Sequence, residues 1–251
     1  MDQKNWFLGV YVLFNQRPHL ACSWLLGSQI IYIKQFMLPV RYGLKISTMK
    51  NQIPEQQTGG KLDTQARAEF TSPEEAKEFY QIAKRRLLHP SNWAEICEVP
   101  LSTFTLTDRE GNTVDREAWD GDYLKIDIPG PGTHSGDSFD WVRIEKVEEE
   151  FALDSEIVSL QARPAANPKS EDTSTAHFFT AMATSTFQVK RIGKTVYAEE
   201  HGRNEVPNTD TSHLADNIRN TLIGWTAKIG LSYPQWKSLV KGIADTSSTN
   251  L

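Results

Sequence analysis

Apolar and polar positions alternate along most of the chain after residue 60, and two periods are present. A period of two is typical of a half-buried β-strand, whereas spacings of three and four are typical of a helix with one apolar face. Strands are predicted at 61–70, 102–107, 123–128, 141–147, 156–163, 176–191 and 195–203. Turn-forming residues separate these stretches, which favours an antiparallel sheet with one covered face.

A helix is predicted directly after the first strand. Ser72 can cap its start, Pro73 suits the first helical position, and Glu75 completes a capping box. The apolar positions that follow have helical spacing and are Ala76, Phe79, Ala83 and Leu87. Proline at position 90 restricts His89 and ends the helix. A second, very short helix is predicted near 91–96.

The chain closes with helical periodicity. Thr209, Asp210 and Thr211 offer N-caps, and a single apolar stripe follows at Leu214, Ile218, Leu222, Trp225 and Ile229. The segment from Gly230 to Pro234 is predicted to interrupt this helix. A shorter last helix then carries Trp236, Leu239, Val240 and Ile243. The long stripe is the natural cover for the apolar face of the sheet.

The predicted order is strand, helix, short helix, six strands and long helix. This order, over residues 61–245, resembles the START-like (SRPBCC, helix-grip) superfamily, although no short motif carries the likeness. The resemblance implies an α+β fold in which a curved antiparallel β-sheet wraps around a long C-terminal helix. It also implies a hydrophobic cavity between sheet and helix, used by members of the family for lipids, polyketides or hormones. Some members are enzymes, including cyclases, so the fold does not fix the function.

Composition excludes several classes of function. A net charge of −5 does not match the basic surface of a nucleic-acid-binding protein. Cys22 and Cys97 are too few and too far apart for a disulfide framework or a cysteine zinc site, and they fit a cytoplasmic protein. Metal-binding and nucleotide-binding motifs are absent, so we expect no metal and no cofactor.

The first 48 residues differ from the rest, with five basic residues and a single acidic one, Asp2. Their two apolar runs, 6–14 and 20–33, are both shorter than a membrane-spanning helix. An extension outside the fold or a start-site artefact, a membrane anchor, and a packed segment all remain open. We therefore expect a doubtful extension at 1–48, a linker at 49–60 and a single START-like domain at 61–251, with no membrane span in 49–251.

The stretch IPGPGTHSGDSFDW (128–141) is rich in glycine and polar residues. Pro129 and Pro131 remove backbone N–H donors that a phosphate site needs, and a strand rather than a helix follows. The spacing of Asp127, Asp137 and Asp140 is not that of an EF-hand calcium loop. The stretch is predicted to connect two strands, with its glycines supplying positive φ, and His134 has at most a gating role.

The leading hypothesis is that a hydrophobic or amphipathic, lipid-like small molecule binds between the sheet and the C-terminal helix. Cavity candidates are the residues on the predicted inner faces: Leu124, Ile126, Val142, Ile144, Leu160, His177, Phe179, Phe187, Leu214, Ile218, Leu222 and Trp225. His177 is either a hydrogen-bonded core residue, a polar contact in the pocket, or a general base. Trp93, Trp141 and Trp225 are expected in the core or the cavity wall.

A polar cluster, His201, Arg203 and Glu205, lies at the end of the last strand. It is either a strand exit that fixes the following turn, or a site in which Arg203 binds a carboxylate and the other two move protons. The second hypothesis is accordingly an enzyme of cyclase or hydrolase type that uses His177 or this cluster. The third is a non-catalytic interaction domain with a filled core. The sequence leaves the oligomeric state open.

Overall fold

The fold was analysed in a computed structural model, which describes residues 51–128, 134–208 and 218–247, with His134, residues 218–229 and Leu231 described by their backbone alone. Residues 1–48 and Leu214 lie outside the described residues. The described part belongs to one compact unit, Lys45–Leu251. None of its helices is long and apolar enough to cross a membrane.

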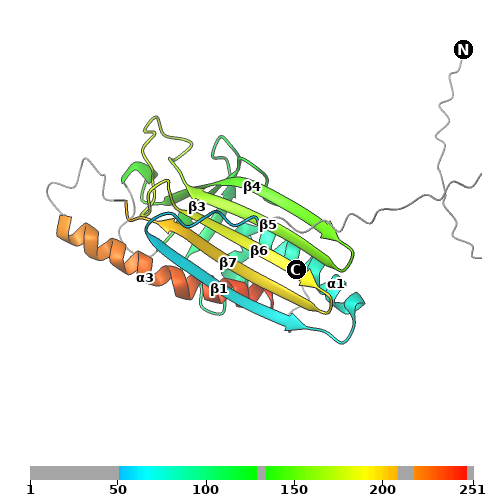
Figure 1. Cartoon of the computed structure of the whole chain (residues 1–251). Coiled ribbons are helices and arrows are strands. Elements are labelled where there is room, and N and C mark those ends of the chain that lie inside the picture. Colours follow the sequence, from blue (N-terminus) through cyan, green and yellow to red (C-terminus); the bar gives the residue numbers. More distant parts are fainter. Residues whose placement is uncertain (1–50, 129–133, 209–217, 248–251) are drawn as a thin grey trace, which may run out of the picture. The chain divides into compact units, whose positions relative to one another are not determined.

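The described residues form an α+β fold built on one curved, seven-stranded antiparallel sheet of order β1-β7-β6-β5-β4-β3-β2 (Figure 1). The strands are β1 (Gly60–Glu69), β2 (Thr103–Thr107), β3 (Tyr123–Asp127), β4 (Asp140–Ala152), β5 (Ser155–Pro164), β6 (Thr184–Ile192) and β7 (Thr195–Glu205). The predicted antiparallel sheet is therefore confirmed. The first strand of the chain, β1, lies at one edge of the sheet and pairs with the last strand, β7.

Helix α1 (Pro73–Leu88) begins as the sequence predicts. The Ser72 hydroxyl accepts the N–H of Glu75 at 3.2 Å, and the carboxylate of Glu75 accepts the hydroxyl of Thr71 at 2.8 Å. His89 ends the helix. The turn η1 (Pro90–Asn92) and the short helix α2 (Trp93–Ile96) follow, in agreement with the short helix expected at 91–96.

The helices and the sheet share one core on the inner face of the sheet. Phe79 and Ala83 of α1 and Leu239 of α3 pack in the same buried cluster as Val158 and Val189 of the sheet. In Figure 1 the sheet lies in front of α1 and α3. The two helices are also joined at their ends, because the buried guanidinium of Arg86 donates to the carbonyls of Gly242, Ile243 and Asp245.

Helix α3 (Ile218–Ile243) is continuous, so the predicted interruption at Gly230–Pro234 is wrong. Proline in a helix removes one N–H and crowds the carbonyl four residues earlier, which here belongs to Gly230. Both Gly230 and Pro234 are exposed. Water can therefore satisfy the freed carbonyl, and the helix tolerates the proline.

The predicted strand at 176–191 is too long at its start. Strand β6 begins at Thr184, and the preceding residues form a loop held against the segment after β7. The backbone N–H of Thr180 donates to the carbonyl of Val206, and the side chain of Asn208 donates to the carbonyl of His177. The apolar residues Phe178, Phe179 and Ala183 of this loop form a second small buried cluster, and Phe179 makes only an isolated β-bridge, with Pro207.

The stretch after β3 connects two antiparallel neighbours, as predicted, since β3 pairs with β4. It contains the turn η2 (His134–Gly136). In its described part, the residues with positive φ are Asp137 (53°) and Ser138 (72°) rather than a glycine. Residues 129–133 lie outside the description.

Candidate ligand-binding cavity

A cavity of about 60 Å³, measured as the space open to the centre of a water molecule, lies between the sheet and α3. That is several times the roughly 10–15 Å³ that one water needs. Its lining residues come from α2, the six strands β2 to β7, the loop before β6, and α3. They are Trp93, Ser102, Phe104, Leu124, Ile126, Ile128, Val142, Ala162, Pro164, His177, Phe178, Phe179, Ala183, Thr184, Ser185, Phe187, Glu205, Ser232, Gln235 and Trp236.

Aromatic rings make up much of the cavity wall. Trp93 lies 4.8 Å from Phe187 and 5.3 Å from Phe104 between ring centroids, and Trp236 lies 5.0 Å from Phe187. The indole N–H of Trp93 donates to the carbonyl of Arg86 at 3.0 Å, which fixes the ring at the end of α1. These contacts place rings from α2, β2, β6 and α3 around one space.

A second aromatic group closes the cavity from the loop before β6. His177 stacks on Phe178 at 4.2 Å between centroids, and Phe178 lies 4.5 Å from Phe179. The Nδ1 atom of His177 accepts the N–H of Phe179 at 2.9 Å. In the neutral ring this places the proton on Nε2. His177 is buried and lines the cavity, but it does so from a loop rather than from the inner face of a predicted strand.

The side chains of strand β7 change faces of the sheet at Asn204. Between the pairs Leu62–Gly202 and Gly60–Glu205, β1 has one residue and β7 has two, so β7 contains a β-bulge. Asn204 has a φ of 56°, and its side chain accepts the backbone N–H of Gln57 at 2.7 Å. The extra residue reverses the alternation of side chains along the strand.

Because of this bulge, Glu205 lies on the inner face and lines the cavity. Gly202 precedes it on the same face, and any side chain at Gly202 would collide with Oε1 of Glu205. The glycine therefore leaves the space that the carboxylate fills. Burial raises the pKa of Glu205 above its usual value of 4.5.

Glu200 lies on the same inner face, opposite Phe187 of β6 and Thr64 of β1. It is completely buried, and among the described residues neither of its carboxylate oxygens has a hydrogen-bond partner. Burial, and then the negative charge of Glu205, hold the pKa of Glu200 well above 4.5, although the positive charge of Arg203 and the Ser185 hydroxyl act to lower it. The two carboxyl groups thus lie close together on the cavity side of β7.

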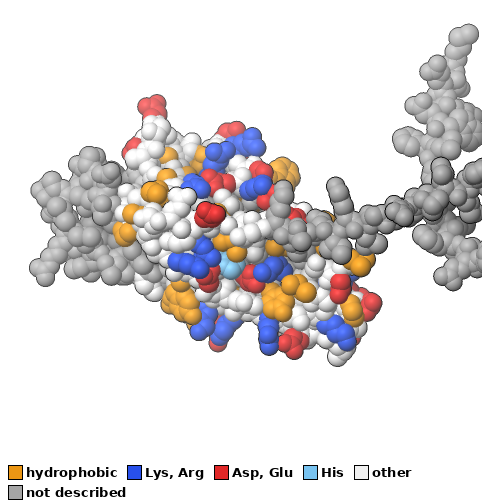
Figure 2. Space-filling view, viewed as in Figure 1, with side chains coloured by type: hydrophobic (Ala, Val, Ile, Leu, Met, Phe, Trp, Pro, Cys, Tyr) orange, Lys and Arg blue, Asp and Glu red, His pale blue; other side chains and the backbone are white. Residues whose placement is uncertain are grey.

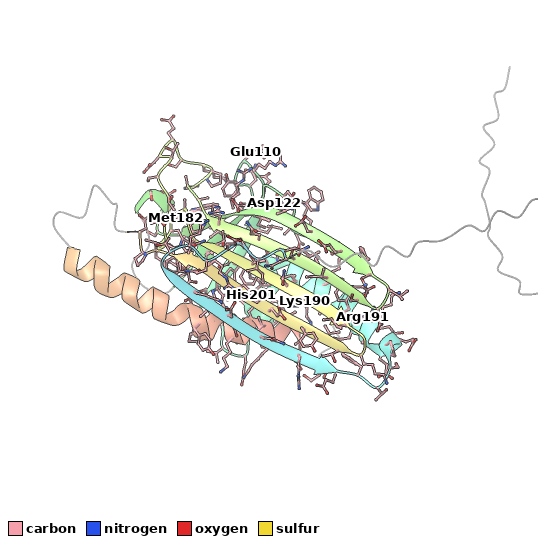
Figure 3. The ribbon with its side chains drawn as sticks, viewed as in Figure 1. Glu110, Asp122, Met182, Lys190, Arg191 and His201 are labelled. Carbon is pink, nitrogen blue, oxygen red and sulfur yellow. The ribbon has the colours of Figure 1, made fainter. Side chains whose placement is uncertain are left out.

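His201 and Arg203 lie on the opposite, outer face of the sheet. His201 contacts Asp63 through Nδ1 at 2.6 Å and Glu199 through Nε2 at 3.0 Å, and Arg203 donates to Asp63 at 2.7 Å. Lys190 forms an ion pair with Glu199 at 2.6 Å. Figures 2 and 3 show this charged group on the face away from the helices, with His201 and Lys190 labelled in Figure 3.

Hydrogen bonds control the acidity of this outer group. Burial alone would raise the pKa of Asp63, but bonds from His201, Arg203 and Lys61 lower it to about 2. Burial likewise raises the pKa of Glu199, and bonds from His201 and Lys190 lower it below its usual value. The pKa values of the carboxyl groups on the two faces of the sheet are therefore shifted in opposite directions.

The structure places the predicted site residues in three groups. Those that line the cavity are Leu124, Ile126, Val142, His177, Phe179, Phe187 and Glu205. Ile144 and Leu160 are buried in the adjoining core, and His201 and Arg203 lie on the outer face. The side chains of Leu214, Ile218, Leu222 and Trp225 lie outside the description, so their role stays a prediction.

Several lining residues are not among the sequence predictions. Phe104 had a usable signal, since it is an aromatic residue in an alternating stretch, whereas alternation would place Phe178 on the face opposite His177 and Phe179. Gln235 had no such signal. Its side-chain carbonyl accepts the backbone N–H of Leu101 at 2.8 Å, a contact made between segments far apart in the chain. Glu200 was missed because a glutamate on an inner face contradicts the pattern by which inner faces are recognised.

Comparison with known proteins gives structural likeness alone. No protein-family model matches the chain, and no curated protein matches it significantly. A solved structure of the hypothetical protein jhp0584 from Helicobacter pylori aligns at 11% identity and a TM-score of 0.39, covering 77% of this chain and 96% of that one.

Two further solved structures align more loosely. The di-domain ARO/CYC BexL from the BE-7585A biosynthetic pathway has 14% identity and a TM-score of 0.34, covering 76% of this chain and 51% of that one. Ara h 8.0201 has 11% identity and a TM-score of 0.30, covering 73% of this chain and 98% of that one.

Proposed function

We propose that this protein has a helix-grip fold of the START-like type and binds a hydrophobic or amphipathic small molecule in the cavity between the sheet and α3. The observation that supports this most is the composition of the cavity wall, in which aromatic and aliphatic side chains surround a few polar groups. Small-molecule sites ordinarily have this composition. The element order and the covered antiparallel sheet support the fold assignment.

Binding of an apolar fluorescent probe tests the proposal. N-phenylnaphthylamine, which is uncharged at neutral pH, should bind saturably at one site, and native mass spectrometry should show whether purified protein retains a ligand. Ala162→Leu adds carbon atoms inside the cavity, because Ala162 is a buried lining residue. This variant should weaken probe binding by about tenfold, the effect of a loss of roughly 1.4 kcal/mol.

A matched control is Ala181→Leu, since Ala181 is exposed in the loop before β6 and does not line the cavity. This variant should bind the probe as the unmodified protein does. Absence of a retained ligand, together with absence of saturable probe binding, would contradict the proposed function and favour the interaction domain with a filled core.

An enzymatic function is supported by one observation, that His177 and Glu205 line the same cavity. A histidine and a carboxyl group of raised pKa are suited to proton transfer. In this case His177→Gln would abolish turnover of a bound ligand while leaving probe affinity nearly unchanged. Equal loss of probe affinity and turnover would identify His177 as a binding residue.

A further inference from the structure

One end of the cavity is acidic, and among the described residues no basic side chain forms an ion pair with its carboxyl groups. Glu205 lines the cavity, and Glu200 lies behind it on the same face of β7. Among the described residues, neither carboxyl group forms an ion pair, and neither oxygen of Glu200 has a hydrogen bond of good geometry, although the Ser185 hydroxyl is close enough to lower its pKa. The nearest basic side chain of the strand, Arg203, is directed to Asp63 on the outer face.

Such an arrangement is unfavourable unless something compensates it. A buried carboxyl group without a partner costs free energy, and two neighbouring carboxylates also repel each other. Proteins retain uncompensated groups of this kind mainly at functional sites. A ligand that brings hydrogen-bond donors and positive charge would compensate both groups.

Glu200 does not itself line the cavity, but it lies next to residues that do. Its carboxyl group interacts with Glu205 and with the hydroxyl of Ser185, and both of these residues line the cavity. Gly202, between the two glutamates, has no side chain to separate them. Glu200 is therefore a buried polar group that borders the same end of the cavity.

The remaining walls suit an organic cation. Trp93, Phe104, Phe187 and Trp236 surround the space, and the faces of aromatic rings attract ammonium groups. An anionic head group, such as that of a fatty acid, would instead be repelled by Glu205. The walls and the acidic end together select for an apolar body with a basic nitrogen.

We propose that the ligand of this cavity is an apolar, preferably aromatic amine, whose ammonium group contacts the carboxylate of Glu205 with Glu200 behind it. This inference rests on the proposed small-molecule binding function and specifies its chemical class. Neutral molecules of the same shape should bind more weakly, because they leave the carboxylate without a charged partner.

Three probes of similar shape test the charge preference: phenethylamine, phenethyl alcohol and hydrocinnamate, each titrated by calorimetry or by NMR shifts at neutral pH. Phenethylamine should bind about tenfold more tightly than the alcohol, since a charge-assisted hydrogen bond replaces a neutral one. Hydrocinnamate should bind weakest. Glu205→Gln should lower the affinity for phenethylamine by about tenfold and change that for the alcohol by less than about twofold.

Glu199→Gln is the matched control, because it removes the same charge from the same strand on the outer face. It should leave the affinity for phenethylamine unchanged. Equal affinity for amine and alcohol, tighter binding of hydrocinnamate, or an equal effect of Glu199→Gln and Glu205→Gln would each overturn the amine assignment while leaving the cavity function in place. If neither these probes nor N-phenylnaphthylamine bind, the proposed function itself fails. The comparison of the three probes on unmodified protein decides the question even if Glu205→Gln does not fold.

Discussion

At the scale of single residues, Glu200 is the most unusual feature of the core. It is fully buried on the face of β7 that otherwise carries Val196 and Ala198, and its oxygens have no hydrogen-bond partner among the described residues. A residue that only filled the core at this position would be apolar. We therefore expect Glu200 to lower stability, which agrees with the role proposed for it at the cavity.

Replacing Glu200 with methionine should stabilise the protein. Methionine has a similar length and removes the unpaired carboxyl group, so the free energy of unfolding at neutral pH should rise by about 1–3 kcal/mol. Urea unfolding followed by circular dichroism measures this change. Glu148→Met, at a residue of the outer, charged part of β4, is a control that should not stabilise. A marked loss of stability on Glu200→Met would show that Glu200 has a stabilising partner.

At the scale of elements, α3 owes its position to a close approach at its C-terminal end. A side chain at Gly242 would collide with the carbonyl oxygen of Ile96 in α2. Arg86 donates to the last carbonyls of the same helix. Trp236 and Gln235, which line the cavity, lie less than two turns before this anchor, so the anchor sets the position of the cavity wall.

Two glycines of α3 give a paired prediction. Gly242→Ala should lower the free energy of unfolding by roughly 1–3 kcal/mol, because the added methyl group overpacks the contact with α2. Gly230→Ala should raise it by about 1 kcal/mol, because the site has open space and alanine favours helix. Thermal and urea unfolding of both variants check these opposite signs. Similar effects of the two substitutions would contradict the close packing of α2 and α3.

The β-bulge in β7 shows how one residue divides a cluster between two faces. Without the extra residue, His201, Arg203 and Glu205 would share a face, as simple alternation predicts. Asn204 adopts a φ of 56°, which asparagine tolerates better than most residues. Its side chain also binds the backbone of Gln57 and Thr58. The segment predicted as a linker therefore holds the bulge that directs Glu205 inward.

At the scale of the whole molecule, two groups of carboxyls act oppositely on stability as pH changes. Asp63 has a pKa of about 2 in the folded state, so its stabilising contribution is present above its usual pKa of 3.8 and is lost as pH falls toward 2. Glu200 and Glu205 have raised pKa values, so their contributions are present below 4.5 and are lost as pH rises above it.

We therefore expect the stability of the protein to be greatest near pH 4 to 4.5, between these usual pKa values of 3.8 and 4.5. Thermal unfolding from about pH 2 to 8 measures the profile. Glu200→Met should flatten the decline above pH 4.5, because it removes the group with the strongly raised pKa. Asp63→Asn should flatten the decline below pH 3.8 by about 1 kcal/mol, a modest amount because Asp63 is partly exposed. An optimum near neutral pH would contradict the assigned charge states.

The sequence by itself determined the elements and the apolar side of the sheet. Strand alternation at 123–128 and 195–203 and the cap at Ser72 depend on neighbouring residues, and these predictions are confirmed in outline. Residues within one strand or helix turn carry that information directly. The α+β class with an antiparallel sheet follows from the order of such elements.

Only the tertiary structure decided which polar residues meet at the cavity. Glu205 enters it because of a bulge fixed by a segment about 150 residues earlier in the chain, and Pro234 is tolerated because it lies on the exposed side of α3. Glu200 is buried because β1 and β6 flank β7. These outcomes depend on contacts between distant segments, which local periodicity does not contain. The chemistry proposed for the cavity rests on those contacts.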